Sequence, residues 1–246
     1  MAAGSVGLAV DLDERQIASW MHLVGYFAIM AYLLGAGIHS QRVGLGEATS
    51  SGQLMDHSQA MRSYLVSILA NVGITYYCWV GVHWRGGTMA TLTGGRWRSW
   101  KDVAVDIAIA VPFCIVWQAT AHWVGLLLGP SEARSLASML PQSGLEVALW
   151  IAVSVTAGFC EEIQSRGYLQ QQLRALSGSV TAAVVGQALV FGLVHSYQGW
   201  KKVIVIAVLG VLYGTLAVWR RDLRANMISH GWLDVWNGWL QQVVWR

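Results

Sequence analysis

Cys160-Glu161-Glu162-Ile163-Gln164-Ser165-Arg166-Gly167 is a short polar stretch inside an apolar part of the chain. Residues 145–159 before it contain a single charge, Glu146, and the apolar pattern resumes after it as far as Leu173. Ionisable groups at the centre of a bilayer cost ~2.5–3.5 kcal/mol each on insertion scales. Two carboxylates and an arginine at such a depth therefore indicate a functional site on a membrane helix.

The composition is that of a membrane protein. Of the 246 residues, 55% are hydrophobic and 12% are charged, whereas a soluble domain usually has about 25% charged residues. Apolar runs of about twenty residues recur, each long enough to cross a hydrocarbon core of ~30 Å. We predict an all-α, polytopic transmembrane helical bundle with about seven spans, six to eight being compatible with the pattern. The predicted spans are Trp20–Ile38, Ser63–Val82, Val103–Leu128, Leu145–Leu173, Val180–Tyr197, Val203–Trp219 and Asn226–Val244.

The chain is expected to form one domain in the bilayer. Residues 1–19 lack the basic n-region of a signal peptide and are predicted to be an N-terminal tail, followed by a single transmembrane domain at 20–246. The connection at 40–62 is polar and is predicted to be a loop. Arg and Lys are more frequent on the side of the N-terminus, which favours a cytoplasmic N-terminus. The expected location is an integral, multi-pass position in a membrane, the cell membrane if the organism is bacterial.

The expected partners follow from the same observations. The lipid bilayer is one, and the net charge of +3 is too small to indicate a nucleic acid. The sequence does not indicate an oligomeric state.

The two adjacent glutamates are expected to have different roles. Neighbouring residues on a helix point about 100° apart, so Glu161 and Glu162 have different surroundings. Glu162 and Arg166 are four residues apart, with the carboxylate N-terminal to the cation, which is the better orientation for an ion pair. Glu161 is then left to face a cavity. The alternative is that both glutamates belong to one buried ion-pair cluster that only fixes helix packing.

Two histidines are distinguished by a partner one helical turn away. Phe191 and His195 share one helix face, and His230 and Asp234 share another. A lone histidine near a helix end is more often interfacial or hydrogen-bonded, and this is the interpretation for the other five. The depths of His195 and His230 set them apart.

The depths of these groups agree with a single site. At a rise of ~1.5 Å per residue, Glu161 lies roughly 18 Å before the predicted turn at 177–179, and His195 lies roughly 22 Å after it on the returning helix. These two side chains can therefore meet. On the last span, His230 and Asp234 lie roughly 6 and 12 Å from the same side, which is somewhat shallower.

This set of side chains suits the hydrolysis of an amide by water. A carboxylate beside a histidine can deprotonate water, and a second imidazole can donate to the oxyanion that forms. Glu161, His195, His230 and Asp234 are also acceptable zinc ligands, so the sequence leaves open whether zinc is a cofactor. HExxH, GxSG and Gly-Asp motifs are missing from the sequence, which counts against zinc site-2-type, rhomboid-type and presenilin-like chemistry.

At these positions the chain resembles the CPBP family of intramembrane proteases, also called the CAAX protease and bacteriocin-processing, type II CAAX prenyl endopeptidase or Abi family. The family pattern is EExxxR, FxxxH and HxxxN or HxxxD, in that order. In this chain it is formed by Glu161-Glu162 with Arg166, Phe191 with His195, and His230 with Asp234. The resemblance covers about residues 145–245.

The resemblance implies an intramembrane endopeptidase, either a metalloprotease or a glutamate-dependent enzyme. Relatives of the eukaryotic and archaeal type remove the last three residues of prenylated CaaX proteins, and bacterial relatives include bacteriocin-processing and self-immunity proteins. By this analogy, a peptide or prenylated protein is the substrate. Glu161 and His195 activate water, His230 and the residue at 234 bind the oxyanion, and Glu162, Arg166 and Phe191 support them.

Position 234 departs from the Asn of the prenyl endopeptidase branch. An ionised Asp cannot donate a hydrogen bond to an oxyanion, whereas Asn can. Three roles remain open for Asp234: it is protonated in an apolar site, it orients His230, or it binds a metal.

Two other function classes compete with a protease. The first is a non-catalytic membrane adaptor or bacteriocin self-immunity factor, which has no need of a water-activating pair. The second is a proton-coupled transporter, in which carboxylates and histidines form a relay. Transporters usually show repeats and broken helices in both halves, whereas here the distinctive groups lie in the second half only.

Overall fold

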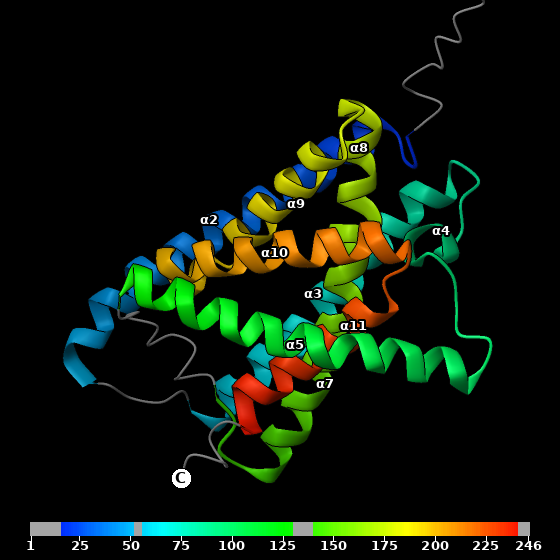
Figure 1. The fold of residues 1–246 in the computed structure, drawn as a ribbon. Coiled ribbons are helices and arrows are strands. Elements are labelled where there is room, and N and C mark those ends of the chain that lie inside the picture. The colour runs from blue at the N-terminus through cyan, green and yellow to red at the C-terminus, as the bar shows by residue number, and fades with distance from the viewer. Residues whose placement is uncertain (1–15, 52–55, 130–139, 241–246) are drawn as a thin grey trace, which may run out of the picture.

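The computed structural model describes residues 16–51, 56–129 and 140–240, and over these ranges the chain is helical with no strand. The transmembrane helical bundle predicted from the sequence is confirmed (Figure 1). The helices are α2 (Trp20–Ser51), α3 (His57–His83), α4 (Met89–Thr93), α5 (Trp100–Leu128), α7 (Gly144–Glu162), α8 (Gln170–Ser177), α9 (Val180–Val194), α10 (Trp200–Arg220) and α11 (Arg224–Val235).

Five stretches of helix are long and apolar enough to cross a membrane. They are Trp20–Val43, His57–His83, Trp100–Leu128, Gly144–Ser177 and Trp200–Arg220. The apolar helix α9 is shorter, with 15 residues, and α11 has 12. The chain is thus an integral, multi-pass membrane protein, and α9 and α11 are shorter helices at the positions of the two remaining predicted spans.

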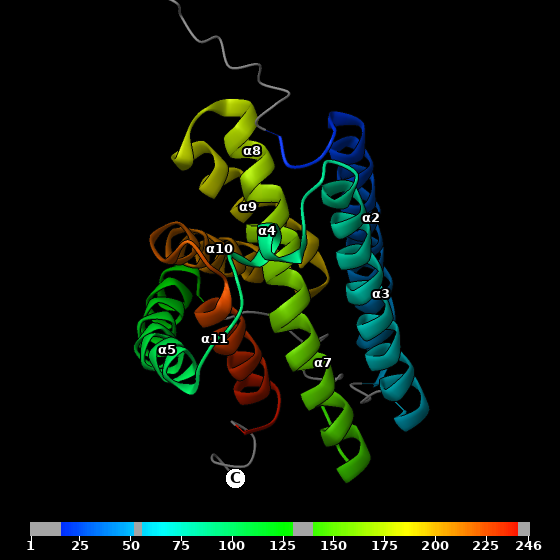
Figure 2. The same cartoon turned by 90° about the vertical axis from the view of Figure 1, so that its right-hand side faces the viewer.

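One continuous helical rod organises the bundle. It begins with α7, continues through a π-helical segment at Ile163–Leu169 and ends with α8. Figure 2 shows α2 and α3 on one side of this rod and α5, α10 and α11 on the other. Both α3 and α11 pack against α7, while α9 packs along α10. The polar stretch of the sequence therefore lies at the centre of the bundle.

The π-helical segment falls directly after the two glutamates. All seven of its residues are buried. A π turn inserts an extra residue into the helix, and such insertions are frequent at functional sites. Gly167 lies within it, where an added Cβ would come 2.5 Å from the carbonyl oxygen of Leu92. This close approach lets α4 pack against the rod.

A second close approach brings α11 against α7. A Cβ added to Gly158 would lie 2.5 Å from the backbone nitrogen of Gly231 and 2.9 Å from the carbonyl oxygen of Met227. Small residues let helix backbones approach in this way in membranes. The crossing lies one turn from Glu162 and directly beside His230, so it determines how near these side chains can come.

One helix boundary predicted from the sequence is found in the structure, and another is not. The predicted turn at 177–179 is present, with Gly178 in the left-handed conformation at φ 65° and Ser179 capping α9. By contrast, α2 continues to Ser51 through part of the stretch 40–62, which was predicted to be a loop. The apolar part of α2 ends near Val43, where the predicted span also ends approximately. The polar residues that follow remain helical beyond the hydrocarbon region.

The last predicted span, Asn226–Val244, also begins in an unexpected place. α11 starts beside α4, where the backbone nitrogen of Leu223 donates to the carbonyl of Thr93 at 3.0 Å. It continues as a π-helical turn at Trp236–Leu240, and residues 241–246 lie outside the described part. Because α11 begins against the middle of the rod and not at the level of the turn at 177–179, its polar residues reach the level of the glutamates.

A buried ionic cluster joins α5 to the connection between α10 and α11. Asp106 has no exposed surface, and its carboxylate lies 2.7 Å from Arg220 and 3.3 Å from Arg224. Trp97 donates to the same carboxylate at 2.8 Å. Asp222 lies 3.0 Å from Arg224 as a further partner. The cluster therefore fixes the corner from which α11 begins.

The N-terminal segment is held against α8 at its end. Gln172 accepts from the backbone nitrogen of Ile17 at 3.0 Å and donates to the carbonyl of Ala18 at 2.8 Å. Residues 16–19 of the predicted tail 1–19 are thus packed on the bundle, whereas 1–15 lie outside the described residues.

Candidate active site

A buried ion pair forms the base of the site. The Nη1 atom of Arg166 lies 2.9 Å from Oε1 of Glu162, and neither side chain has exposed surface. The guanidinium carbon lies 4.2 Å from the ring centre of Phe191 and 5.3 Å from that of Tyr213. Such contacts between a cation and aromatic faces are favourable when desolvated. The pair predicted from the spacing of four residues is therefore present.

Glu162 also binds two groups from α11. Its Oε2 accepts from Nδ2 of Asn226 at 3.0 Å, and its Oε1 lies 2.9 Å from Nδ1 of His230. Nδ2 of Asn226 also donates to the carbonyl of Tyr213 at 3.0 Å. Both carboxylate oxygens are thus engaged by protein groups, so Glu162 anchors its neighbours and is not available to a water molecule.

Glu161 has a different environment. Its side chain is 20% exposed, and its Oε2 lies 3.8 Å from Nε2 of His195 and 3.8 Å from Nε2 of His230. Its other oxygen accepts from Nδ2 of Asn71 at 3.5 Å. The expectation that the side chains of Glu161 and His195 meet, which came from their depths, agrees with this geometry.

The orientation of His195 is determined by the backbone. Its Nδ1 lies 2.7 Å from the carbonyl oxygen of Phe191, one turn earlier. A carbonyl oxygen only accepts, so Nδ1 must hold the proton, and Nε2 faces Glu161. Phe191 thus makes two contacts in the site: its carbonyl oxygen accepts from His195, and its ring packs on Arg166. This accounts physically for the spacing of four residues between Phe191 and His195.

His230 is surrounded by carboxylates. Its Nδ1 faces Glu162, and its Nε2 faces Glu161. Nε2 also lies 3.7 Å from Oδ2 of Asp234, whose side chain is 39% exposed. The ring of Tyr213 stacks on His230 at 5.5 Å between centroids. Nε1 of Trp150 donates to the carbonyl of Asp234 at 3.1 Å and helps to hold the end of α11.

The structure brings all seven candidate residues into one place. They are Glu161, Glu162, Arg166, Phe191, His195, His230 and Asp234. Polar residues that the sequence did not single out also touch them, namely Tyr213, Asn226 and Asn71. Asn226 lies four residues before His230 on the same face, a spacing that could have revealed it. Asn71 lies on α3, and no local pattern marks it; Gln164 donates to its side-chain oxygen at 3.2 Å.

The comparison with known families bears on this arrangement. Residues 143–236 match the model of the family described as type II CAAX prenyl endopeptidase Rce1-like. This region is an Rce1-like domain. The EExxxR, FxxxH and HxxxD residues all lie within it, and the family predicted from them is confirmed. No curated protein and no solved structure matches the chain.

The Rce1-like domain supports a coarse assignment of activity. At the level of the family, the matched region supports a CAAX-type intramembrane protease and so a hydrolase. Its site has the two elements that amide hydrolysis requires, a carboxylate open to water and imidazole groups facing it. The roles of single residues are not contained in the family match.

Zinc was left open by the sequence, and Glu161, His195, His230 and Asp234 are the residues of the Rce1-like domain that could hold it. Zinc ligands lie about 2.0–2.2 Å from the metal in a tetrahedron. Donor atoms around a tetrahedral zinc are therefore about 3.3–3.6 Å from one another, and the facing atoms of Glu161, His195, His230 and Asp234 are 3.7–3.8 Å apart. Among the described residues, no group of three His, Cys, Asp or Glu is arranged to hold a metal ion. The chemistry proposed below uses protein groups and water.

Proposed function

We propose that the chain is an intramembrane endopeptidase that hydrolyses a peptide bond of a membrane-associated or prenylated substrate with water activated by Glu161 and His195. The main support is the 3.8 Å separation between Oε2 of Glu161 and Nε2 of His195. With Nδ1 of His195 donating to Phe191, both facing atoms are hydrogen-bond acceptors. Two acceptors facing one another favour a donor between them.

A single water molecule suits this gap. The separation is too long for a direct hydrogen bond, and polar contacts beyond ~3.5 Å are often bridged by water. A water between the two acceptors would donate one hydrogen to Glu161 and one to His195. Its oxygen lone pairs would then be directed away from both, toward a substrate carbonyl. Glu161 is the general base in this arrangement.

His230 is proposed to stabilise the oxyanion. Arg166 favours the ionised form of Glu162, and an ionised carboxylate only accepts, so Nδ1 of His230 donates to it. A neutral His230 would then have no hydrogen on Nε2. The imidazolium form has one, and the carboxylates of Glu161 and Asp234 favour that positive charge. Asp234 acts through His230 in this proposal and makes no direct hydrogen bond to the oxyanion.

The proposed reaction balances without a further reactant. The water oxygen bonds to the carbonyl carbon while one water proton passes to Glu161, and Nε2–H of His230 donates to the oxyanion. When the C–N bond breaks, the proton on Glu161 passes to the leaving nitrogen. Collapse of the intermediate gives a carboxylic acid and an amine, the remaining water proton passes from the acid to the amine to give a carboxylate and an ammonium group, and Glu161 is again ionised.

The proposal also includes the extent of the catalytic core and the orientation of the chain in the membrane. We assign the catalytic core to residues 145–245 within one transmembrane domain, and we place the N-terminus in the cytoplasm from the distribution of Arg and Lys. Labelling of single-cysteine variants at the N-terminus with a membrane-impermeant reagent tests that orientation. Labelling of intact cells would contradict it.

The decisive experiment measures cleavage of a fluorogenic farnesyl-CaaX peptide by the full chain purified in detergent. We expect cleavage by wild type and its loss in Glu161→Gln and in His195→Gln, while exposed Arg62→Gln serves as the control. Equal cleavage with and without a zinc chelator is expected. If folded wild-type protein does not cleave any such peptide, and Glu161→Gln leaves its cellular phenotype intact, the adaptor or self-immunity function replaces the protease.

A further inference from the structure

Glu161 receives a hydrogen bond from outside the Rce1-like domain. Its Oε1 accepts from Nδ2 of Asn71, which lies on α3, a helix that packs along α7 and the π-helical segment (Figure 2). The matched region begins at residue 143, so the family match contains no role for Asn71. Among the described residues, no other hydrogen bond to the Glu161 carboxylate is found. The surroundings of Asn71 therefore bear directly on the proposed general base.

The amide of Asn71 has a determined orientation. Nε2 of Gln164 lies 3.0 Å from the backbone carbonyl oxygen of Asn71 and 3.2 Å from its Oδ1. A backbone carbonyl only accepts, so the NH2 group of Gln164 faces Asn71, and Oδ1 accepts from it. Nδ2 of Asn71 then points to the other side, where Oε1 of Glu161 lies at 3.5 Å. The reverse orientation would bring two NH2 groups together and leave two oxygen atoms facing each other.

Buried groups hold Asn71 in place. The side chain of Gln164 is buried in the π-helical segment, and its Nε2 also lies 3.1 Å from Oγ1 of Thr75, one turn after Asn71 on α3. The hydroxyl of Thr75 donates to the carbonyl of Cys160, the residue before Glu161, at 3.4 Å. Asn71 thus belongs to a network that joins α3 to the rod, and it is the member that reaches the carboxylate.

The two oxygens of Glu161 differ as a result. Oε1 has a donor, whereas Oε2 lies 3.8 Å from Nε2 of His195 and 3.8 Å from Nε2 of His230. The distance of 3.5 Å to Asn71 is long, as is common for catalytic hydrogen bonds before substrate binds. Hydrogen bonding stabilises the negative charge on Oε1. Oε2 is therefore the oxygen that is left to take a proton.

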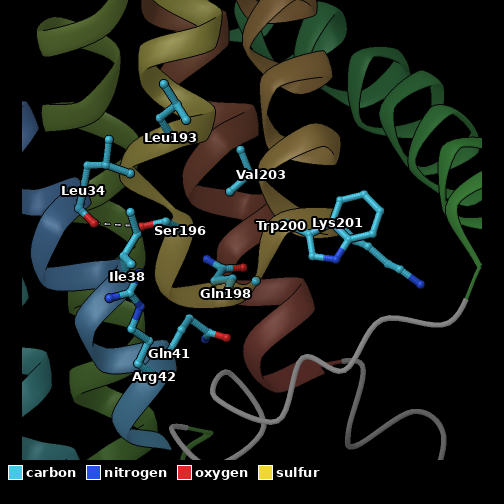
Figure 3. A pocket seen from close by; sticks show the side chains of 11 residues that line it. Leu34, Ile38, Gln41, Arg42, Leu193, Ser196, Gln198, Trp200, Lys201 and Val203 are labelled. Carbon is cyan, nitrogen blue, oxygen red and sulfur yellow. Dashed lines mark hydrogen bonds between the residues drawn. The ribbon is translucent and has the colours of Figure 1, made fainter. Parts of the chain in front are cut away.

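The other member of the water-activating pair is held from α2. Directly after His195, the hydroxyl of Ser196 donates to the carbonyl of Leu34 at 3.3 Å (Figure 3). Gln41, also on α2, donates to the carbonyl of Tyr197. The carboxylate and the imidazole are therefore each held by a helix that precedes the Rce1-like domain, α3 for the former and α2 for the latter.

We propose that Asn71 is a positioning residue of the enzyme, which holds Oε1 of Glu161 so that Oε2 faces His195 and takes the water proton. This inference rests on the proposed function and extends the site to α3. The amide of Asn71 neither gains nor loses a proton, so the proposed reaction keeps its balance. A misplacement of ~1 Å can cost about 10²-fold in rate, and we expect kcat to fall about 10–100-fold without the donor.

The test removes the donor and then restores it. Asn71→Leu approximately keeps the size of the side chain and has no donor, whereas Asn71→Gln retains an amide. With the full chain in detergent and the fluorogenic farnesyl-CaaX peptide, Asn71→Leu should lower kcat about 10–100-fold and leave KM unchanged. Asn71→Gln should keep more of the wild-type kcat than Asn71→Leu. If Asn71→Leu does not fold, Asn71→Ala takes its place.

Two matched variants on α3 separate positioning from helix packing. Thr75→Val removes another acceptor of Gln164 without removing a hydrogen bond to Glu161. It should therefore lower the unfolding midpoint at least as far as Asn71→Leu does and leave kcat close to wild type. Val72→Ala shortens a neighbouring side chain that is 50% exposed and should change neither quantity. If Thr75→Val lowers kcat as much as Asn71→Leu does, Asn71 contributes only to packing and the inference is overturned.

The outcomes also distinguish this inference from the proposed function. Cleavage that is lost in Glu161→Gln but unchanged in Asn71→Leu would retain the protease and overturn the role of Asn71. Folded wild-type protein that does not cleave, or Glu161→Gln that cleaves as wild type does, would overturn both. A fall of kcat in Asn71→Leu, its recovery in Asn71→Gln and an unaffected kcat in Thr75→Val would together support the inference.

Discussion

Nδ1 of His230 lies 2.9 Å from Oε1 of Glu162, and this contact joins the polar face of α11 to the centre of the helical rod. The same oxygen lies 2.9 Å from Nη1 of Arg166. One buried carboxylate thus holds a fixed cation and a titratable imidazole. Removing any of these three groups alters the charge balance of the other two.

Arg166→Met should destabilise the protein by about 3–5 kcal/mol, because it leaves the charge of Glu162 buried without its partner. The measurement is unfolding in mixed detergent micelles. The double variant Glu162→Gln with Arg166→Met should be less destabilised than the sum of the single variants. Additive effects would show that the two residues do not act as a pair.

The adjacent carboxylates should respond differently to the same change. Glu161→Gln should lower kcat by ~10²–10⁴-fold and leave the unfolding transition at its wild-type position, since its contacts are 3.5 Å or longer. Glu162→Gln should lower both activity and stability. Equal stability losses would argue instead for one structural ion-pair cluster, the alternative left open by the sequence.

Asp234→Asn distinguishes two roles for this residue. If Asp234 favours the imidazolium form of His230, as we propose, the amide removes a charge and kcat falls by about tenfold. If position 234 donates directly to the oxyanion, the amide supplies a donor and kcat is retained or rises. Steady-state kinetics with the farnesyl-CaaX peptide, beside Asp234→Ala, separates the two outcomes.

Gly158→Ala should lower activity without removing any polar group. The new Cβ would come 2.5 Å from the backbone of Gly231 and push α11 away from α7. The expected loss of stability is ~1–3 kcal/mol, as for overpacked interiors. Gly35→Ala, in a helix with nothing within 4 Å of the added atom, is the control and should be neutral. An active Gly158→Ala would show that the site tolerates a wider helix separation.

Local spacing was sufficient to predict part of the site. Glu162 and Arg166 are four residues apart on one helix, so their pairing follows from helix geometry alone. The proximity of Glu161 and His195 followed from counting residues to the turn at 177–179, because two helices joined by a tight turn run back along each other. The apolar runs likewise predicted the helices, since few other structures satisfy the backbone in a bilayer.

Other features depended on packing that the sequence does not display. The π-helical segment at Ile163–Leu169 leaves no mark on a hydropathy pattern. Asn71 reaches Glu161 from a helix about ninety residues earlier. α11 begins against the middle of the rod, which corrected the estimate that His230 is shallower than the glutamates. The end of α2 was misplaced because polarity marks the membrane boundary and not the end of a helix.

The cluster around Asp106 bears on how the protein is made. The matched region at 143–236 contains Arg220 and Arg224, but their buried carboxylate partner lies on α5, outside that region. During synthesis α5 enters the bilayer before these arginines leave the ribosome. The matched region therefore does not contain all of its own ion-pair partners: the corner from which α11 begins is completed by an acidic side chain on α5, a helix made earlier in synthesis.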